Sequence, residues 1–168
     1  MMEDFAMTRQ QEKAETYRYM REAKIRDLYI AYADQFPDYF LTLASKCNMP
    51  YSEFVRRVRE FHHHLDRKLL HRPPQGKPLA LRTDGIMFLE QITTHIHGHA
   101  MVRFAGNETT ATLREHCAAI WAKLCPGGTI DLQEQYDGNL SGYVTKEMTS
   151  WGYDDLRQTI LFRDLIGS

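Results

Sequence analysis

The chain has 168 residues, of which 43% are hydrophobic and 26% are charged, and its formal net charge is −1. This length suits one domain with its own core, and the composition argues against disorder, a coiled coil or a collagen-like repeat. No stretch approaches the roughly 20 apolar residues of a membrane span, and the N-terminus lacks the apolar core of a secretory signal, so we expect a cytoplasmic protein without membrane contact. The three cysteines form no CxxC pair, which argues against a disulfide framework and a thiolate zinc site.

The first half of the chain predicts two helices with one strand between them. Alternating charges among apolar residues predict a long helix over residues 8–33. The apolar run at residues 39–44 predicts a buried strand. Apolar residues recur every three or four positions over residues 54–70, which predicts an amphipathic helix. Three prolines within residues 72–78 then predict an exposed loop, because proline has no backbone N–H donor.

The second half predicts a strand hairpin, a helix, another strand and closing helices. These are expected, in chain order, at residues 86–90, 95–104, 112–124, 129–136 and 141–149, with further helical structure up to residue 166. The order predicts an α+β fold, with a ferredoxin/RRM-like antiparallel sheet and helices mainly on one face. We treat residues 1–36 as an N-terminal helical extension and residues 37–168 as the domain that carries the chemistry.

Three alternating histidines are the most informative pattern in the chain. On a strand, residues two apart point to the same face, so His95, His97 and His99 are expected to project together. Glu90, on the preceding strand of the hairpin, could add a carboxylate. Two imidazoles and a carboxylate suit a catalytic divalent metal rather than a closed structural site. The alternative is that these histidines are polar residues on an exposed sheet face.

Three further histidines, His62, His63 and His64, are consecutive. Because neighbouring helical residues point about 100° apart, these three side chains do not converge easily on one ion. We interpret them as solvated or DNA-facing residues of the helix at residues 54–70.

A tyrosine and a lysine form the second informative pattern. Tyr143 and Lys146 are three residues apart, so on a helix they present a phenol and an ammonium group to the same space. A phenol is a poor nucleophile because its pKa is about 10, but a nearby cation lowers that pKa, and a metal can activate the group under attack. The alternative is that Tyr143 is a half-buried packing residue. Tyr136 and Tyr153 are the nearest competing phenols.

A local excess of basic residues offers a surface for DNA. Residues 53–82 contain eight Lys or Arg and three acidic residues, in a chain that is nearly neutral as a whole. Seven of the basic residues are candidates for phosphate contact: Arg56, Arg57, Arg59, Arg67, Lys68, Arg72 and Lys77. The alternative is that they form an ordinary solvated helix face.

Three short blocks in chain order resemble those of the HUH endonucleases, specifically the rolling-circle replication initiators of plasmids, phages and small single-stranded DNA viruses. The blocks are Phe40-Leu41-Thr42-Leu43, similar to a hydrophobic first motif; His97-Gly98-His99-Ala100-Met101-Val102-Arg103-Phe104, similar to the metal-holding strand; and Tyr143-Val144-Thr145-Lys146, similar to the nucleophile helix. The resemblance spans residues 39–147, and the N-terminal helix lies outside it.

The resemblance implies a metal-dependent enzyme that nicks and joins one DNA strand. Tyr143 would form a covalent 5′-phosphotyrosine and leave a free 3′-hydroxyl, with Lys146 near the phosphate. Glu90 and two of His95, His97 and His99 would hold Mg²⁺ or Mn²⁺, and His97 is common to both His-x-His registers. The expected partners are single-stranded or origin hairpin DNA and host replication proteins, with the oligomeric state left open. The alternatives are a single-tyrosine HUH transposase and a ferredoxin-like nucleic-acid-binding module without catalysis.

Overall fold

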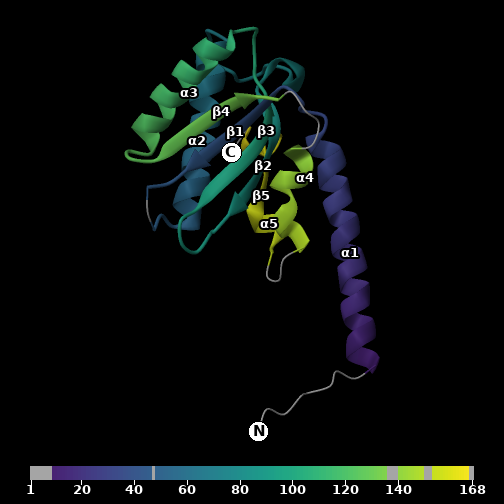
Figure 1. Ribbon diagram of the computed structural model, residues 1–168. Helices are drawn as coiled ribbons and strands as arrows, with labels where there is room; N and C mark the ends of the chain where they lie inside the picture. Colours follow the sequence, from purple (N-terminus) through teal and green to yellow (C-terminus); the bar gives the residue numbers. More distant parts are fainter. Residues whose placement is uncertain (1–8, 47, 136–139, 150–152, 167–168) are drawn as a thin grey trace.

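The centre of the protein is a five-stranded antiparallel sheet (Figure 1). The computed structural model describes residues 9–46, 48–135, 140–149 and 153–166. The strands lie in the order β4-β1-β3-β2-β5. Their bounds are β1 (Tyr39–Ala44), β2 (Asp84–Glu90), β3 (His97–Arg103), β4 (Thr129–Glu134) and β5 (Thr159–Leu161). Strand β3 lies between β1 and β2, the split βαβ arrangement of ferredoxin-like folds, so the predicted α+β class is confirmed.

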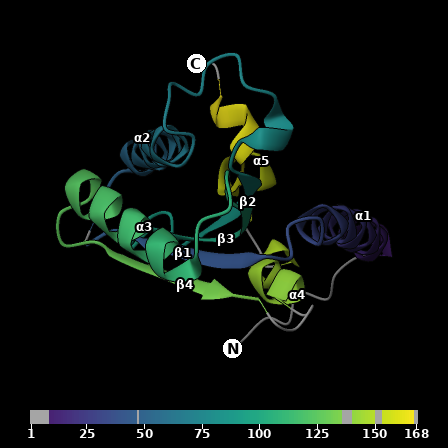
Figure 2. The ribbon, with the colours of Figure 1, turned by 90° about the horizontal axis from the view of Figure 1, so that it is seen from above.

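Two long helices cover one face of this sheet. Helices α2 (Tyr51–Leu69) and α3 (Thr110–Leu124) pack side by side there (Figure 2). Alternate residues of the strands, such as Leu41 and Met87, point into this layer and are fully buried. The rings of Phe54 and Phe61 each meet that of Trp121 edge-on at 5.9 Å. Burial of each such large side chain stabilises the fold by about 1.5–3 kcal/mol.

The opposite face of the sheet is covered only in part. Helix α1 (Arg9–Ala33) and the short helix α4 (Leu140–Val144) lie on this side (Figure 2). Their apolar side chains pack on Phe40, Phe88 and Met101, which are among the strand residues that point away from α2 and α3. The N-terminal half of α1 extends past the sheet, and Tyr17 on it is exposed (Figure 1). The prediction of helices mainly on one face therefore holds for α2 and α3, whereas α1 and α4 lie on the opposite face (Figure 2).

The structure differs from the sequence-based prediction at three places. Strand β3 begins at His97 and not at residue 95, because a turn with a left-handed Gln91 (φ 51°) precedes it. The helix expected at residues 141–149 is divided, since α4 ends at Val144 and the 3₁₀-helix η2 (Lys146–Thr149) follows. Residues 159–161, expected to be helical, form β5 because their backbone completes the edge of β2.

The remaining elements are short. One follows the proline-rich loop at residues 72–78, and two lie in the C-terminal region. They are the 3₁₀-helix η1 (Leu79–Leu81), helix α5 (Asp155–Gln158) and the 3₁₀-helix η3 (Phe162–Leu165). Within the described ranges, no helix combines the length and the apolar character needed to cross a bilayer. Cys117 and Cys125 are buried free thiols, as the absence of a CxxC pair predicts for these two residues.

Candidate active site

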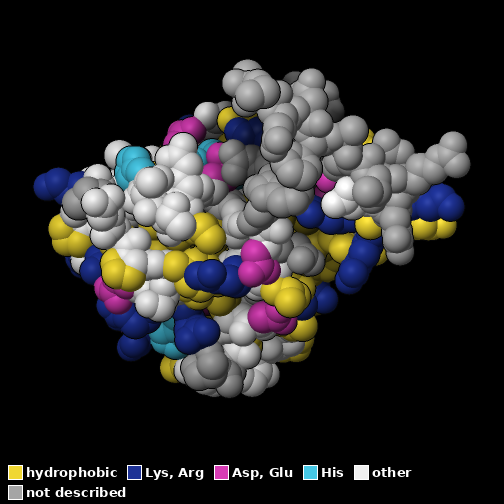
Figure 3. All heavy atoms as spheres, turned by 90° about the horizontal axis from the view of Figure 1, so that it is seen from below, with side chains coloured by type: hydrophobic (Ala, Val, Ile, Leu, Met, Phe, Trp, Pro, Cys, Tyr) yellow, Lys and Arg dark blue, Asp and Glu magenta, His cyan; other side chains and the backbone are white. Residues whose placement is uncertain are grey.

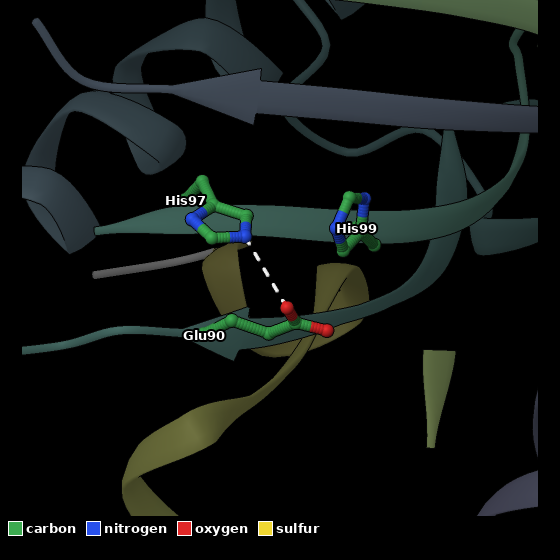
Figure 4. A group of neighbouring side chains, drawn as sticks. All are labelled: Glu90, His97 and His99. Carbon is green, nitrogen blue, oxygen red and sulfur yellow. Dashed lines mark hydrogen bonds and ion pairs between the residues drawn. The ribbon is translucent and has the colours of Figure 1, made fainter. Parts of the chain in front are cut away.

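Two adjacent strands bring Glu90, His97 and His99 together on the partly covered face. Glu90 on β2 lies directly opposite His97 on β3, and His99 follows two residues later on the same face. One potential ligand atom from each of the three side chains lies within 4.8 Å of the others. Figure 4 shows the two imidazole rings side by side on β3 and the carboxylate reaching toward them from β2. The hairpin register thus assembles the two-imidazole, one-carboxylate set that the sequence predicts.

Hydrogen bonds orient both rings. The Nδ1 atom of His97 donates to the carbonyl oxygen of His95 at 3.0 Å, and Nδ1 of His99 is hydrogen-bonded to Oγ1 of Thr42 at 2.9 Å. A partner at Nδ1 leaves Nε2 as the nitrogen that each ring can offer to a metal, which is the usual role of outer-shell hydrogen bonds in metal sites. The ring of Phe40 stacks on that of His99, with centroids 5.5 Å apart, and limits its rotation.

The carboxylate of Glu90 is buried, and its hydrogen bonding is incomplete. Its side chain is 7% exposed. Oε2 lies 3.3 Å from Nε2 of His97, and Oε1 lies 3.4 Å from Nζ of Lys146 but has no partner in hydrogen-bond geometry among the described residues. Nε2 is the ring nitrogen of His97 that faces Oε2, because Nδ1 donates to the carbonyl oxygen of His95. A buried carboxylate whose Oε1 lacks a hydrogen-bond partner among the described residues, beside two imidazole rings, is a donor set that fits a divalent metal.

The electrostatics of His99 favour the form that binds metals. Burial lowers the pKa of His99 below its ordinary value, and the nearby positive charge of Lys146 acts in the same direction, whereas Glu90 opposes them. A lowered pKa keeps the imidazole neutral near pH 7. A neutral imidazole has the lone pair that a metal ligand needs.

The phenol of Tyr143 lies beside this cluster. Tyr143 on α4 is 49% exposed, and its ring centroid is 5.9 Å from that of His99 and 6.4 Å from that of Phe40. The Nζ atom of Lys146 lies 4.1 Å from the centre of the Tyr143 ring. Tyr143 and Lys146 therefore share one space, as predicted, although a break between α4 and η2 and not a continuous helix brings them there.

Lys146 connects the phenol with the carboxylate. Burial alone would lower the pKa of Lys146, but the interactions with Tyr143 and with the charge of Glu90 outweigh it and raise the pKa. Lys146 is thus a stable cation between the two groups. Its side chain is 40% exposed, so it also faces the solvent.

His95 lies apart from the cluster. It is in the turn before β3, and a ring nitrogen of His95 contacts the carbonyl oxygen of Ser45. Its ring centroid lies 6.5 Å from that of His97. The prediction that all three imidazoles project together from one strand is wrong for His95, because the strand begins two residues after it.

The predicted DNA-contacting residues lie on the other side of the sheet. Helix α2 carries five of them, and the following loop carries Arg72 and Lys77. Arg56 is paired with Glu53 and Glu60, and Arg57 with Glu53. Arg59, Arg67, Lys68 and Arg72 are exposed, and Lys77 is half-buried. Figure 3 shows Lys and Arg side chains interspersed with Asp and Glu on the face seen from below. These residues do not lie near Tyr143, so their contact with DNA stays a prediction.

The interpretation of His62 as a solvated or DNA-facing residue is wrong. Its exposed fraction is 2%, and its Nε2 atom donates to the carbonyl oxygen of Thr83 at 2.8 Å. The apolar positions Val58 and Leu65 are four residues before it and three after it, so His62 belongs to the buried stripe of α2. That spacing is a sequence signal that identifies its burial.

Two residues that support the site were given no role there by the sequence analysis. Thr42 lies within the predicted first strand, but its pairing with His99 depends on the β1–β3 register. Arg26 lies in the N-terminal helix and bonds to backbone carbonyls 116 and 119 residues further along the chain. No local pattern indicates such a long-range contact.

Comparisons with protein-family models, with curated proteins and with solved structures find no match to this chain.

Proposed function

We propose that this protein is a metal-dependent endonuclease that nicks and joins single-stranded DNA through a covalent 5′-phosphotyrosine on Tyr143, in the manner of HUH replication initiators. The observation that carries the proposal is the position of the Tyr143 ring, 5.9 Å from the ring of His99 and next to the Glu90–His97–His99 cluster. A phenol, an ammonium group and a metal-ligand set converge on one solvent-facing site. This combination suits attack on a phosphodiester.

The cluster would hold Mg²⁺ or Mn²⁺ through Glu90, His97 and His99. When bound there, the cation would supply Lewis-acid polarisation of the scissile phosphate. Two imidazoles favour Mn²⁺ over the harder Mg²⁺, which prefers oxygen ligands. The buried carboxylate contributes the negative charge, and the hydrogen bonds at Nδ1 of both histidines hold the rings in place.

In the cleavage step, the phenolic oxygen of Tyr143 attacks the phosphorus atom. The new bond joins this oxygen to phosphorus, and the bond from phosphorus to the 3′-oxygen breaks. The phenol proton leaves to solvent and the departing oxygen takes up a proton, so that the products are a 5′-phosphotyrosine and a free 3′-hydroxyl. Attack by a 3′-hydroxyl on the phosphotyrosine reverses the step and joins two ends without an external energy source.

Lys146 has two tasks in this scheme. Its ammonium group lies 4.1 Å from the centre of the Tyr143 ring, so it offers positive charge where the phosphate has to enter. Its ion pair with Glu90 at 3.4 Å keeps that charge between the nucleophile and the ligand cluster. The partly exposed phenol and ammonium leave the site open to a polymer that passes across the sheet.

The experiment that tests the proposal is covalent capture of DNA. The protein is incubated with Mn²⁺ and a pool of randomised single-stranded oligonucleotides, and denaturing gels and peptide mass spectrometry detect the adduct. We expect an adduct on Tyr143 that requires the metal, and its rate should fall at least about 10³-fold in Tyr143→Phe. Tyr153→Phe is the matched control, because the Tyr153 hydroxyl is hydrogen-bonded to Thr159 on the same side of the sheet.

Two outcomes would overturn the proposal. An adduct that persists in Tyr143→Phe assigns the nucleophile to another residue. A folded wild-type protein that forms no adduct from the pool with Mn²⁺ or Mg²⁺, and that shows no Mn²⁺ binding by calorimetry, indicates a binding module without catalysis.

A further inference from the structure

The segment that carries Tyr143 and Lys146 has little stability of its own. Helix α4 is five residues long, far shorter than the roughly 12 residues at which an isolated helix becomes marginally stable in water. The carbonyl groups in the last turn of a helix also lack intrahelical partners. Something outside the segment must therefore hold Tyr143 next to His99.

Arg26 of helix α1 supplies this support through its guanidinium group. The Nη2 atom donates to the carbonyl oxygen of Gly142 at 3.2 Å. The Nε atom donates to the carbonyl oxygen of Thr145 at 3.1 Å and to its Oγ1 at 3.3 Å. One planar group thus joins α4 to Thr145, the residue between α4 and η2, with a fork geometry that suits arginine and not lysine.

The two carbonyl groups held by Arg26 have a particular place in the chain. Gly142 directly precedes Tyr143, and Thr145 directly precedes Lys146. Fixing these two peptide groups fixes the backbone from which the phenol and the ammonium group project. Thr145 is fully buried and its Oγ1 also donates to the carbonyl oxygen of Ser141 at 2.8 Å, so the contact with Arg26 is continuous with the internal bonds of α4.

Apolar packing places α1 where Arg26 can act. Ile25 and Tyr29, one residue before and three after Arg26, pack in the same cluster as Val144 and Met148. The ring of Tyr29 meets that of Phe88 on β2 edge-on at 6.2 Å. Helix α1 is therefore anchored on the sheet, and Figure 2 shows it beside α4 on the same face. Because α1 is anchored, the guanidinium group of Arg26 has a fixed position from which it can bond to Gly142 and Thr145.

We propose that Arg26 is a positioning residue for the reaction of Tyr143, and that the N-terminal helix is part of the nucleophile's scaffold rather than a separate extension. This inference rests on the proposed function for its effect on rate. Its structural part, that Arg26 holds the backbone of residues 142–148, can be tested without any activity. The hydrogen bonds of Arg26 run to Gly142 and Thr145 and not to the ligand cluster or the phenol, so its loss should leave metal binding intact.

The test compares Arg26→Ala and Arg26→Lys with Arg21→Ala, a matched control on an exposed position of the same helix. We expect the first-order rate of adduct formation at saturating oligonucleotide to fall about 10- to 100-fold in Arg26→Ala, with a smaller loss in Arg26→Lys. The affinities for Mn²⁺ and for the oligonucleotide should stay within about twofold of wild type. If only the rate of adduct formation falls and both affinities are kept, the variant is folded and Arg26 acts by positioning Tyr143.

Hydrogen exchange supplies the readout that does not depend on activity. The amide groups of Thr145 and Met148 are protected by bonds to Ser141 and Thr145, respectively. Their exchange rates should rise about 10-fold in Arg26→Ala and stay unchanged in Arg21→Ala. An unchanged exchange rate, or a wild-type adduct rate in Arg26→Ala, would overturn the inference. If the wild-type protein forms no adduct but exchange accelerates, the support by Arg26 stands and the proposed function fails.

Discussion

The glycine between His97 and His99 has too little space around it for an added methyl group, so Gly98→Ala should destabilise the protein. Gly98 points from β3 into the α2–α3 layer, opposite to His97 and His99. A Cβ atom at this position would lie 2.5 Å from Sδ and 2.8 Å from Cγ of Met87, and 3.0 Å from Cδ2 of Leu89. Both neighbouring side chains are fully buried, so they have little room to move away.

The expected cost of Gly98→Ala follows from two opposing effects. Overpacking of a core costs about 1–3 kcal/mol. Replacing a glycine by alanine stabilises the folded state by about 0.4–1 kcal/mol, because the unfolded chain loses conformational freedom. The free energy of unfolding should therefore fall by about 1 kcal/mol, within a range of about 0–2.6 kcal/mol, and a fall of about 1 kcal/mol should lower Tm by about 2–4 °C. Urea denaturation monitored by circular dichroism measures this change.

A double-mutant cycle makes the prediction specific to Met87. Met87→Ala alone should cost about 2–5 kcal/mol through the cavity that it leaves. In that background Gly98→Ala should be close to neutral, since the two nearest atoms have been removed. The coupling free energy should then reach about 1 kcal/mol, well above the roughly 0.5 kcal/mol scatter of independent sites. Equal costs of Gly98→Ala in both backgrounds would show that the side chains do not meet as described.

Two further predictions concern histidines. His97→Ala should weaken Mn²⁺ binding at least about 10-fold in calorimetric titration, whereas His95→Ala should change it less than about twofold, and equal losses would place His95 in the site. Burial lowers the pKa of His62 below its ordinary value of 6.5, so the unfolded chain binds more protons below that pH and the stability should fall as the pH drops, by up to about 1.4 kcal/mol per pH unit. His62→Gln should flatten this slope in urea denaturation, and an unchanged slope would assign it to other groups.

The ligand cluster could be predicted from sequence because it depends on local geometry. Period-two spacing on one strand places His97 and His99 on the same face, and a short connection makes Glu90 the cross-strand partner of His97. His95 fits the same alternation, but strand β3 begins two residues later than the pattern indicates. The left-handed conformation of Gln91 sets that boundary, and alternation of residue types carries no information about it.

The support of Tyr143 could not be predicted from sequence, because it depends on contacts between distant segments. The spacing of Tyr143 and Lys146 correctly indicates a shared space, but not the break between α4 and η2. Arg26 is one of several basic residues in a helix with alternating charges, and only the docking of α1 on the sheet distinguishes it from the others. Strand β5 likewise depends on the free edge of β2 rather than on the propensity of its three residues.

The two halves of the proposed site are held by different means, and this difference has a consequence for the chemistry. The ligand set projects from two central strands that are paired along their whole length, so its geometry is as rigid as the sheet. Tyr143 projects from a five-residue helix whose place depends on one arginine and a small apolar cluster. A metal site needs fixed ligand distances, whereas a nucleophile that becomes esterified and is released again has to accommodate a phosphate that is attached in one step and removed in the next. Rigid strands for the ligands and a separately supported short helix for the phenol meet both requirements within one sheet face.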